Sequence, residues 1–240
     1  MIDAVVFDMD GVLVDSEHVW DEIREQLARE RGGRWHEQAQ RDMMGMSSPE
    51  WSRYMHEVIA LPESPEEINA EVVRRLAGRY REDLALIDGA AAAVERLAAR
   101  WPLAVASSSN RPIIDLVLAL GGLDRFFSAT VSSEEVARGK PAPDVYLEAA
   151  TRLGADPGRC AAVEDSHNGL LAAWAAGMRV LAIPNRRYPP GDDALAAADA
   201  VLTSIRGLTT AAIEGSRQAR RGPGPRRVAR PAPEKKAERG

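Results

Sequence analysis

The chain has 240 residues, of which 45% are hydrophobic and 28% are charged, and its net charge is −5. These values are typical of a globular protein with one domain and an insert, and no apolar run reaches the roughly 18 residues of a membrane span. Cys160 is the sole cysteine and no basic segment followed by an apolar one marks the N-terminus, so we expect a cytoplasmic protein without disulfides and without a membrane partner.

The chain begins with one predicted strand and continues with a helical stretch. Residues 4–7 are apolar and end in Asp8, Asp10 and Gly11, as at the carboxyl end of a buried strand. Apolar spacing and helix-start patterns predict three helices, at 17–31, 48–59 and 64–80. No strand pattern interrupts residues 17–84, so we expect them to form an all-helical module.

From residue 88 onward, strand and helix patterns alternate. Strands are predicted at 103–106, 129–132, 161–163, 179–183 and 200–202, and helices at 89–100, 113–120, 144–153 and 170–176. Such alternation is typical of an α/β fold with a parallel sheet and helices on both faces. The predicted organisation is therefore a discontinuous α/β core of residues 1–16 and 85–215, with the helical module of residues 17–84 inserted into it.

Residues 216–240 differ from the rest of the chain in composition. They contain nine basic and two acidic residues, many Pro and Gly, and few apolar residues, which predicts a disordered basic tail. Residues 1–215 hold 22 basic and 34 acidic residues, and this acidic body argues against nucleic-acid binding by the folded part. The tail is a candidate contact for nucleic acid, an anionic surface or an acidic partner, although a solvated extension is the simpler interpretation.

Polar side chains follow the predicted strands or precede a helix next to them. The set comprises four carboxylates, a hydroxyl and an ammonium: Asp8, Asp10, Glu164, Asp165, Ser107 and Lys140. The carboxyl ends of parallel strands meet in one crevice, so we expect these groups to lie together. Carboxylates suit Mg²⁺, and a Lys and a Ser suit a phosphoryl group. Because no phosphate-binding Gly-Lys-Ser/Thr loop is present, the sequence predicts phosphoryl transfer with a carboxylate nucleophile.

Three stretches, residues 7–17, 139–144 and 163–169, carry a family resemblance. Over residues 1 to about 205 the chain resembles the haloacid dehalogenase-like (HAD) superfamily, and most closely its branch of phosphatases and β-phosphoglucomutases with a helical cap. The resemblance implies a Rossmann-like core, a mobile cap and a Mg²⁺-dependent phosphatase. That enzyme would hydrolyse a small phosphorylated metabolite, such as a sugar or polyol phosphate, through an aspartyl-phosphate.

The resemblance also implies a role for each motif residue. Asp8 is the nucleophile, and Asp10 is the general acid and base. Ser107, with backbone amides near Ser108, binds the phosphoryl group, and Gly11 allows a tight turn in which amides approach it. Lys140 orients Asp8 and neutralises charge. The implied metal ligands are Asp8, the backbone carbonyl of Asp10, Asp165 and, directly or through water, Glu164.

Two residues separate the activities found within this family. Dehalogenases lack a second acid at the place of Asp10, so Asp10 favours phosphate esters, and phosphonate hydrolases need a cap lysine that residues 17–84 lack. Trp20 stands where a β-phosphoglucomutase has His, and residues 44–48 lack both cations of the corresponding mutase stretch. A phosphatase is therefore preferred. A mutase is the alternative, and a non-enzymatic binding protein on the same scaffold is a weaker one.

The cap is expected to select the substrate. Its candidate contacts are Trp20, Arg24, Met44, Met46 and Ser47. For Trp20 and the two Met residues, packing within the cap is the alternative interpretation.

Overall fold

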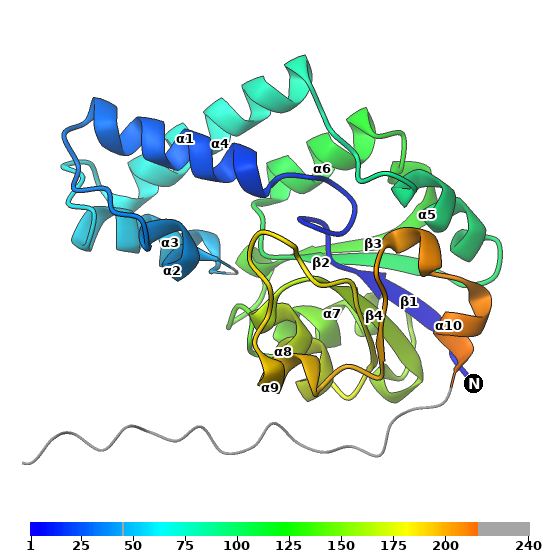
Figure 1. Cartoon of the computed structure of the whole chain (residues 1–240). Coiled ribbons are helices and arrows are strands. Elements are labelled where there is room, and N and C mark those ends of the chain that lie inside the picture. Colours follow the sequence, from blue (N-terminus) through cyan, green and yellow to red (C-terminus); the bar gives the residue numbers. More distant parts are fainter. Residues whose placement is uncertain (45, 216–240) are drawn as a thin grey trace, which may run out of the picture.

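The computed structural model describes residues 1–44 and 46–215, and a six-stranded parallel sheet forms its centre (Figure 1). The strands are β1 Ala4–Phe7, β2 Leu103–Ser107, β3 Phe127–Ser132, β4 Cys160–Glu164, β5 Arg179–Ala182 and β6 Ala200–Val201. β1, β2, β4 and β5 are buried along their whole length, which explains why their sequences are apolar runs without alternation. The predicted α/β fold with a Rossmann-like parallel sheet is confirmed.

Helices cover both faces of the sheet. Val5 and Phe7 of β1 point to the face covered by α5 Ala90–Ala98, α6 Arg111–Leu120 and α10 Thr210–Glu214. Ala4 and Val6 point to the other face, which is covered by α7 Asp144–Arg152, α8 His167–Ala175 and α9 Asp192–Leu195. Four short 3₁₀ turns complete the core: Asp124–Phe126, Ser133–Glu135, Pro157–Arg159 and Ile205–Gly207.

The order of the strands determines where a ligand can bind. Across the sheet the order is β3-β2-β1-β4-β5-β6, so successive strands are added in opposite directions on the two sides of the β1–β4 pair. In open α/β sheets the ligand crevice lies outside the carboxyl ends of the strands at such a point. The residues that follow β1 and β4 are therefore the ones placed to meet a ligand.

Four helices between β1 and α5 form a separate group beside the sheet, which we call the helical insert (residues 17–82; Figure 1). They are α1 Glu17–Glu30, α2 Ala39–Met43, α3 Ser48–Glu57 and α4 Pro65–Glu82. Ser47 and Ser64 cap α3 and α4 through capping boxes, each with a Glu three residues later and a Pro at the start of the helix. The two connections to the core run together, since the Asp15 N–H donates to the Ala85 carbonyl at 2.9 Å.

The observed elements extend the sequence prediction in a few places. α2, α9 and α10 were not predicted, because segments of four or five residues are too short to show helical periodicity. The division into a core and a cap stays a prediction, and the predicted disordered tail at 216–240 lies outside the described residues.

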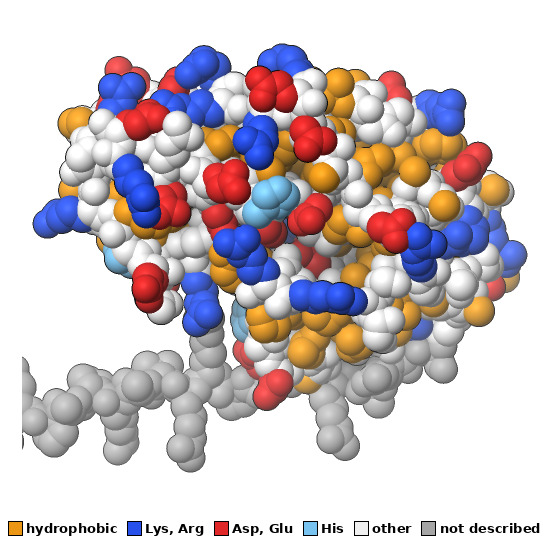
Figure 2. Space-filling model, turned by 45° about the horizontal axis from the view of Figure 1, so that its top comes forward, with side chains coloured by type: hydrophobic (Ala, Val, Ile, Leu, Met, Phe, Trp, Pro, Cys, Tyr) orange, Lys and Arg blue, Asp and Glu red, His pale blue; other side chains and the backbone are white. Residues whose placement is uncertain are grey.

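Two observations concern the predicted cytoplasmic location and the predicted lack of nucleic-acid binding: the hydrophobicity of the helices and the charges on the surface. No helix in residues 1–44 and 46–215 is long and apolar enough to cross a membrane. On the face shown in Figure 2, acidic and basic side chains are mixed over the insert and the core. The cytoplasmic location and the absence of nucleic-acid binding stay predictions.

Candidate active site

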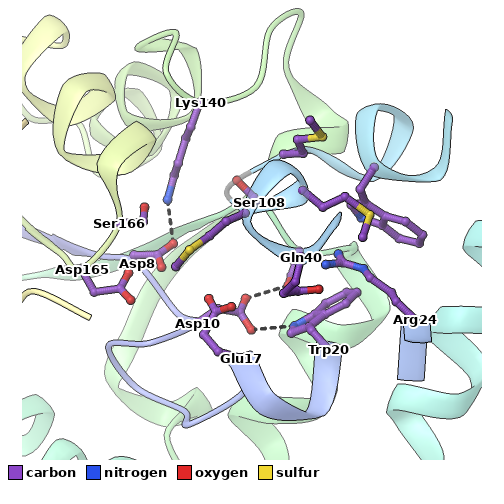
Figure 3. Close-up of a pocket in the computed structure, with 15 residues that line it drawn as sticks. Asp8, Asp10, Glu17, Trp20, Arg24, Gln40, Ser108, Lys140, Asp165 and Ser166 are labelled. Atoms are coloured by element: carbon purple, nitrogen blue, oxygen red, sulfur yellow. Dashed lines mark hydrogen bonds and ion pairs between the residues drawn. The ribbon is translucent and has the colours of Figure 1, made fainter. Parts of the chain in front are cut away.

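Three strand ends and one loop bring the predicted polar groups together. Asp8 follows β1, Ser107 is the last residue of β2, and Glu164 is the last residue of β4. Lys140 reaches the same place from the loop between β3 and α7. Asp8 and Lys140 line one side of a cavity whose other side is formed by the helical insert (Figure 3). The convergence expected from the parallel sheet is therefore present.

Lys140 is the central cation of the core side. Its Nζ lies 2.6 Å from Asp8 Oδ1 and 2.6 Å from Glu164 Oε1, and all three side chains are buried. Burial alone would lower the pKa of Lys140, but the Asp8 and Glu164 carboxylates outweigh burial and raise it. Lys140 is therefore a permanent ammonium that fixes the orientation of Asp8.

Glu164 uses both of its carboxylate oxygens within the protein. Oε1 accepts hydrogen bonds from Lys140 and, at 2.7 Å, from the Tyr146 hydroxyl. Oε2 accepts from the backbone N–H groups of Asp165 and Ser166 and from the Ser166 hydroxyl. This arrangement holds Lys140 in place. It suits the predicted metal role of Glu164 better through water than by direct ligation.

Three acidic side chains could hold a metal ion. One carboxylate oxygen each of Asp8, Glu164 and Asp165 lies within 4.8 Å of the others, and all three residues are buried. Burial, reinforced by neighbouring acids, raises the pKa of Asp165 well above its usual range, and burial raises that of Asp8 against the opposing effect of Lys140. Three carboxylates against one ammonium leave an excess of buried negative charge. An oxygen-binding divalent cation such as Mg²⁺ fits this donor set.

Asp10 is held from both sides of the cavity. Its Oδ1 accepts from Trp20 Nε1 at 3.1 Å (Figure 3). Its Oδ2 accepts from the Ser109 hydroxyl at 2.7 Å. The Ser107 hydroxyl reaches the same Oδ2 at 3.4 Å. Because Trp20 belongs to the insert and Ser109 to the core, the direction of the Asp10 carboxylate depends on both parts of the molecule.

The serines after β2 have different positions. Ser107 is fully buried and its hydroxyl accepts the Ser109 N–H at 3.0 Å, so it supports the turn. Ser108 lines the cavity, and its buried hydroxyl has no partner among the residues that the structure describes. Ser108 is therefore better placed than Ser107 to bind a phosphoryl group.

The absence of a side chain at Gly11 leaves room for one acid of the cluster, Asp165. Its backbone has φ +78°, and its N–H donates to the Val14 carbonyl at 2.9 Å, so this amide is used within the turn. A Cβ at Gly11 would lie 1.9 Å from Asp165 Oδ2. Glycine at position 11 therefore lets Asp165 approach the end of β1.

On the insert side, Trp20, Arg24, Met44 and Met46 line the cavity, whereas Ser47 caps α3. Further lining residues that the sequence analysis did not single out as site residues are Glu17, Gln40, Met43, Trp51, Ser109 and Ser166. Glu17 and Ser109 directly adjoin predicted site motifs, which is a usable signal. Gln40 and Trp51 stand in helices with nothing in the sequence to mark them.

Glu17 introduces an ionisable group on the insert side. It is the first residue of α1 and is partly buried beside the cavity. Burial, followed by the nearby Asp10 carboxylate, raises the pKa of Glu17 to about 7, with Arg24 opposing. At neutral pH both the protonated and the ionised form of the Glu17 carboxyl group are therefore populated.

The loop after β5 connects the acidic cluster to the insert. Asn185 donates to Asp165 Oδ2 at 2.9 Å, and its own Oδ1 accepts the backbone N–H groups of Arg187 and Tyr188. The Tyr188 hydroxyl donates to Asp21 Oδ2 on α1 at 2.5 Å. One continuous set of hydrogen bonds thus runs from the predicted metal ligand to the helical insert.

Comparison with known proteins agrees with this geometry. Hexitol phosphatase B of Escherichia coli (strain K12) is 33% identical over 220 residues, which cover 88% of this chain and 96% of that protein. The bifunctional riboflavin kinase/FMN phosphatase of Arabidopsis thaliana is 32% identical over 204 residues, 84% of this chain, and the match spans only 53% of that protein. The crystal structure of CbbY from Rhodobacter sphaeroides in complex with phosphate aligns with a TM-score of 0.80 at 27% identity, covering 90% of this chain and 100% of that one.

A family model gives the assignment. The model of the haloacid dehalogenase-like hydrolases matches residues 2–177, a range that contains every core-side acid and the lysine described above. The predicted resemblance is confirmed, and the chain belongs to the haloacid dehalogenase-like hydrolase family.

Proposed function

We propose that this protein is a Mg²⁺-dependent phosphatase that hydrolyses a small phosphorylated metabolite, such as a sugar or polyol phosphate, through an aspartyl-phosphate. The observation that carries the proposal is the pairing of Asp8 with a buried Lys140 at 2.6 Å, next to a second carboxylate, Asp10, that Trp20 and Ser109 orient. The phosphatase names of relatives, hexitol phosphatase B among them, support the same class of substrate.

In the first half of the reaction, Asp8 is the nucleophile. One of its carboxylate oxygens forms a bond to phosphorus while the bond from phosphorus to the ester oxygen breaks. Protonated Asp10 gives its proton to the departing oxygen, so the alcohol leaves neutral. Lys140 fixes the orientation of Asp8, and Ser108, whose hydroxyl has no partner among the described residues, lines the cavity in which the phosphoryl oxygens would lie.

In the second half, water replaces the alcohol. Asp10, now a carboxylate, takes a proton from water as the water oxygen attacks phosphorus and the bond to Asp8 breaks. Inorganic phosphate leaves, and Asp8 and the protonated Asp10 are restored. The hydrogen bonds from Trp20 and Ser109 keep the Asp10 carboxylate directed into the cavity during both steps.

The acidic cluster would hold the metal. Asp8 and Asp165, with the backbone carbonyl of Asp10 and with Glu164 through water, are the proposed ligands. When bound, Mg²⁺ supplies positive charge that offsets the charge of the phosphoryl oxygens and the carboxylates. The raised pKa values of Asp8 and Asp165 are consistent with this role, because a cation beside them favours the ionised carboxylates that the reaction needs.

The alternatives are less well supported. In a mutase, Asp10 would share its site with a cap His, but here Trp20 occupies that position and donates to Asp10. A non-enzymatic scaffold would not need a nucleophile, an acid and a lysine close together. Asp8, Asp10 and Lys140 all line the cavity.

A chromogenic assay with p-nitrophenyl phosphate tests the proposal. Asp8→Asn should lower kcat/KM by at least about 10⁴-fold, since the nucleophile is lost. Asp15→Asn, an exposed acid in the same loop, is the matched control and should retain wild-type turnover. EDTA should abolish wild-type activity and Mg²⁺ should restore it. Retained activity in Asp8→Asn would rule out the aspartyl-phosphate, and indifference to EDTA would rule out the metal.

A further inference from the structure

Arg24 is a second buried cation in the cavity, on the side opposite Lys140. It belongs to α1, its exposed fraction is only 5%, and it lines the cavity together with Trp20 and Gln40. Figure 3 shows it on the insert side, across the cavity from Lys140 and Asp8. A substrate whose phosphoryl group lies at Asp8 would therefore extend its other end toward Arg24.

Two aromatic rings lie against the Arg24 guanidinium. Its Cζ lies 4.6 Å from the ring centre of Trp20 and 4.7 Å from that of Trp51. Both distances are in the range of cation–π contacts, and neither ring supplies a hydrogen-bond acceptor with a lone pair. The N–H groups on its edge remain as the only hydrogen-bond donors, in the fork geometry that matches a carboxylate or phosphate.

The N–H groups of Arg24 have no hydrogen-bond partner among the residues that the structure describes. The Arg24 Nε is buried without a hydrogen-bond acceptor, and residues 1–44 and 46–215 form no ion pair with the guanidinium. The side-chain amide of Gln40 in the same cavity is also buried, and neither its oxygen nor its nitrogen has a partner in that part of the chain. Burial lowers the pKa of Arg24 to about 10, so it stays charged at neutral pH.

The acids nearest to Arg24 form no ion pair with it in the described part of the chain. Asp10 is held by Trp20 and Ser109, whereas Asp21 Oδ2 accepts from the Tyr188 hydroxyl and pairs with Arg187. Asp21 Oδ1 is buried without a partner among the described residues, so it does not reach the guanidinium. Glu17 lines the same cavity and forms no ion pair with Arg24 in the described part of the chain. A buried cation without a close counter-ion is costly, and an anionic ligand would remove that cost.

We propose that the substrate carries a second anionic group, a carboxylate or a phosphate, at the end remote from the transferred phosphoryl group, and that the edge of Arg24 binds it with help from Gln40. This inference rests on the proposed phosphatase function and narrows its substrate class. A polyol phosphate with only hydroxyl groups would leave the Arg24 charge unpaired. Arg24, with Trp20 and Trp51 against it, then determines specificity, separately from the core-side groups that perform the reaction.

The test compares phosphate release from matched pairs of substrates. 3-Phosphoglycerate is set against glycerol 3-phosphate to probe a carboxylate, and fructose 1,6-bisphosphate against fructose 6-phosphate to probe a second phosphate. The wild-type protein should favour the doubly charged member of at least one pair by about 10- to 150-fold in kcat/KM, the value of one charge-assisted hydrogen-bond pair. The pair that shows the preference identifies the anionic group.

Variants show whether Arg24 causes the preference. Arg24→Met should reduce the ratio within the preferred pair to about one, whereas Arg24→Lys should keep part of it, because the charge remains without the fork. Arg53→Met, an exposed arginine on α3, is the matched control and should retain the wild-type ratio. Circular dichroism checks that each variant is folded.

Three results would overturn the inference: no wild-type preference in either pair, a preference that survives in Arg24→Met, or a preference lost equally in Arg53→Met. The wild-type ratio alone suffices if Arg24→Met does not fold. Asp8-dependent hydrolysis of p-nitrophenyl phosphate would show in each case that the proposed phosphatase function still stands. Absence of phosphate release from every ester would contradict that function instead.

Discussion

Lys140 and Arg24 are both buried cations of one cavity, but their surroundings differ. Lys140 pairs with two carboxylates at 2.6 Å, and Glu164 behind it has both oxygens hydrogen-bonded. Arg24 lies within cation–π distance of two tryptophans but has no hydrogen bond or ion pair in the described part of the chain, and Gln40 in the same cavity lacks partners there too. Lys140 and its carboxylates are therefore paired with one another without a substrate, although the acidic cluster and the Ser108 hydroxyl can still take a cation and a phosphoryl group. On the insert side, by contrast, the cation itself is without a counter-ion that a ligand could supply.

This difference matches two roles that we propose: the core side performs the reaction, and the insert side selects the substrate. The core-side groups act on the phosphoryl group, which every candidate substrate shares, and they can be fixed in advance. The insert-side groups face the part of the substrate that varies. Their polar atoms stay unpaired until that part binds, which makes the site discriminate against molecules that cannot pair them.

The largest effect is expected from removing the core-side cation. Lys140→Met leaves two buried carboxylates without their partner, so the free energy of unfolding should fall by about 3–5 kcal/mol. Arg24→Met in the same cavity is the matched comparison. It relieves an unpaired charge but loses two cation–π contacts worth about 1–2 kcal/mol each, so its unfolding free energy should stay within about 1 kcal/mol of wild type. Urea unfolding in EDTA measures the unfolding free energy of both variants. Equal losses in Lys140→Met and Arg24→Met would show that the two cations do not differ in how they are paired.

A smaller effect should depend on pH. Because the pKa of Glu17 is raised from 4.5 to about 7, folded Glu17 keeps a proton that the unfolded chain has already lost, and stability falls as pH rises through this window. Glu17→Gln should therefore gain about 3 kcal/mol of unfolding free energy over wild type at pH 8 and almost nothing at pH 4. Measurements in EDTA keep metal ions out of the comparison.

Glu22→Gln serves as the control for this titration. Glu22 lies on the same helix but is exposed, so Glu22→Gln should not stabilise the protein at pH 8 as Glu17→Gln does. A Glu17→Gln difference that is independent of pH would mean that Glu17 titrates as an ordinary carboxyl group.

The smallest effect concerns the contact that joins the two sides. Tyr188→Phe removes the hydrogen bond from the core loop to Asp21 on α1. The free energy of unfolding should fall by about 1 kcal/mol. If substrate binding requires the insert to stay in position, KM should rise about three- to fivefold. Tyr54→Phe removes a similar bond, to Asp42, that lies entirely within the insert, and it should leave KM unchanged. An equal KM change in both variants would show that the contact between core and insert has no special role.

Much of the fold follows from local patterns. The buried strands are continuous apolar runs, and glycines or acids end them, so their order along the chain already predicts a parallel sheet. Ser47 and Ser64 mark two helix starts through capping boxes. The sequence could not indicate α2, because five residues make little more than one turn and its position depends on packing against α3.

The site was predictable only where it adjoins strand ends. Asp8, Asp10, Lys140 and Asp165 stand at such ends or in short motifs beside them, and the cavity brings them together. Trp51 and Gln40 reach the cavity through the packing of helices, which no local pattern encodes. Trp20 was considered both a substrate contact and a packing residue, and it is buried, lines the cavity and also donates to Asp10.

Gly11 and Gly169, which lie against the acids Asp165 and Glu164, restrict which substitutions this sequence can accept. A Cβ at Gly11 would lie 1.9 Å from the Asp165 carboxylate, and a Cβ at Gly169 would lie 1.9 Å from the Glu164 carboxylate. Each acid occupies the volume that any side chain at its glycine would need. A larger residue at either position is therefore compatible only with a shortened acid opposite it, so these four positions should change in pairs among related chains.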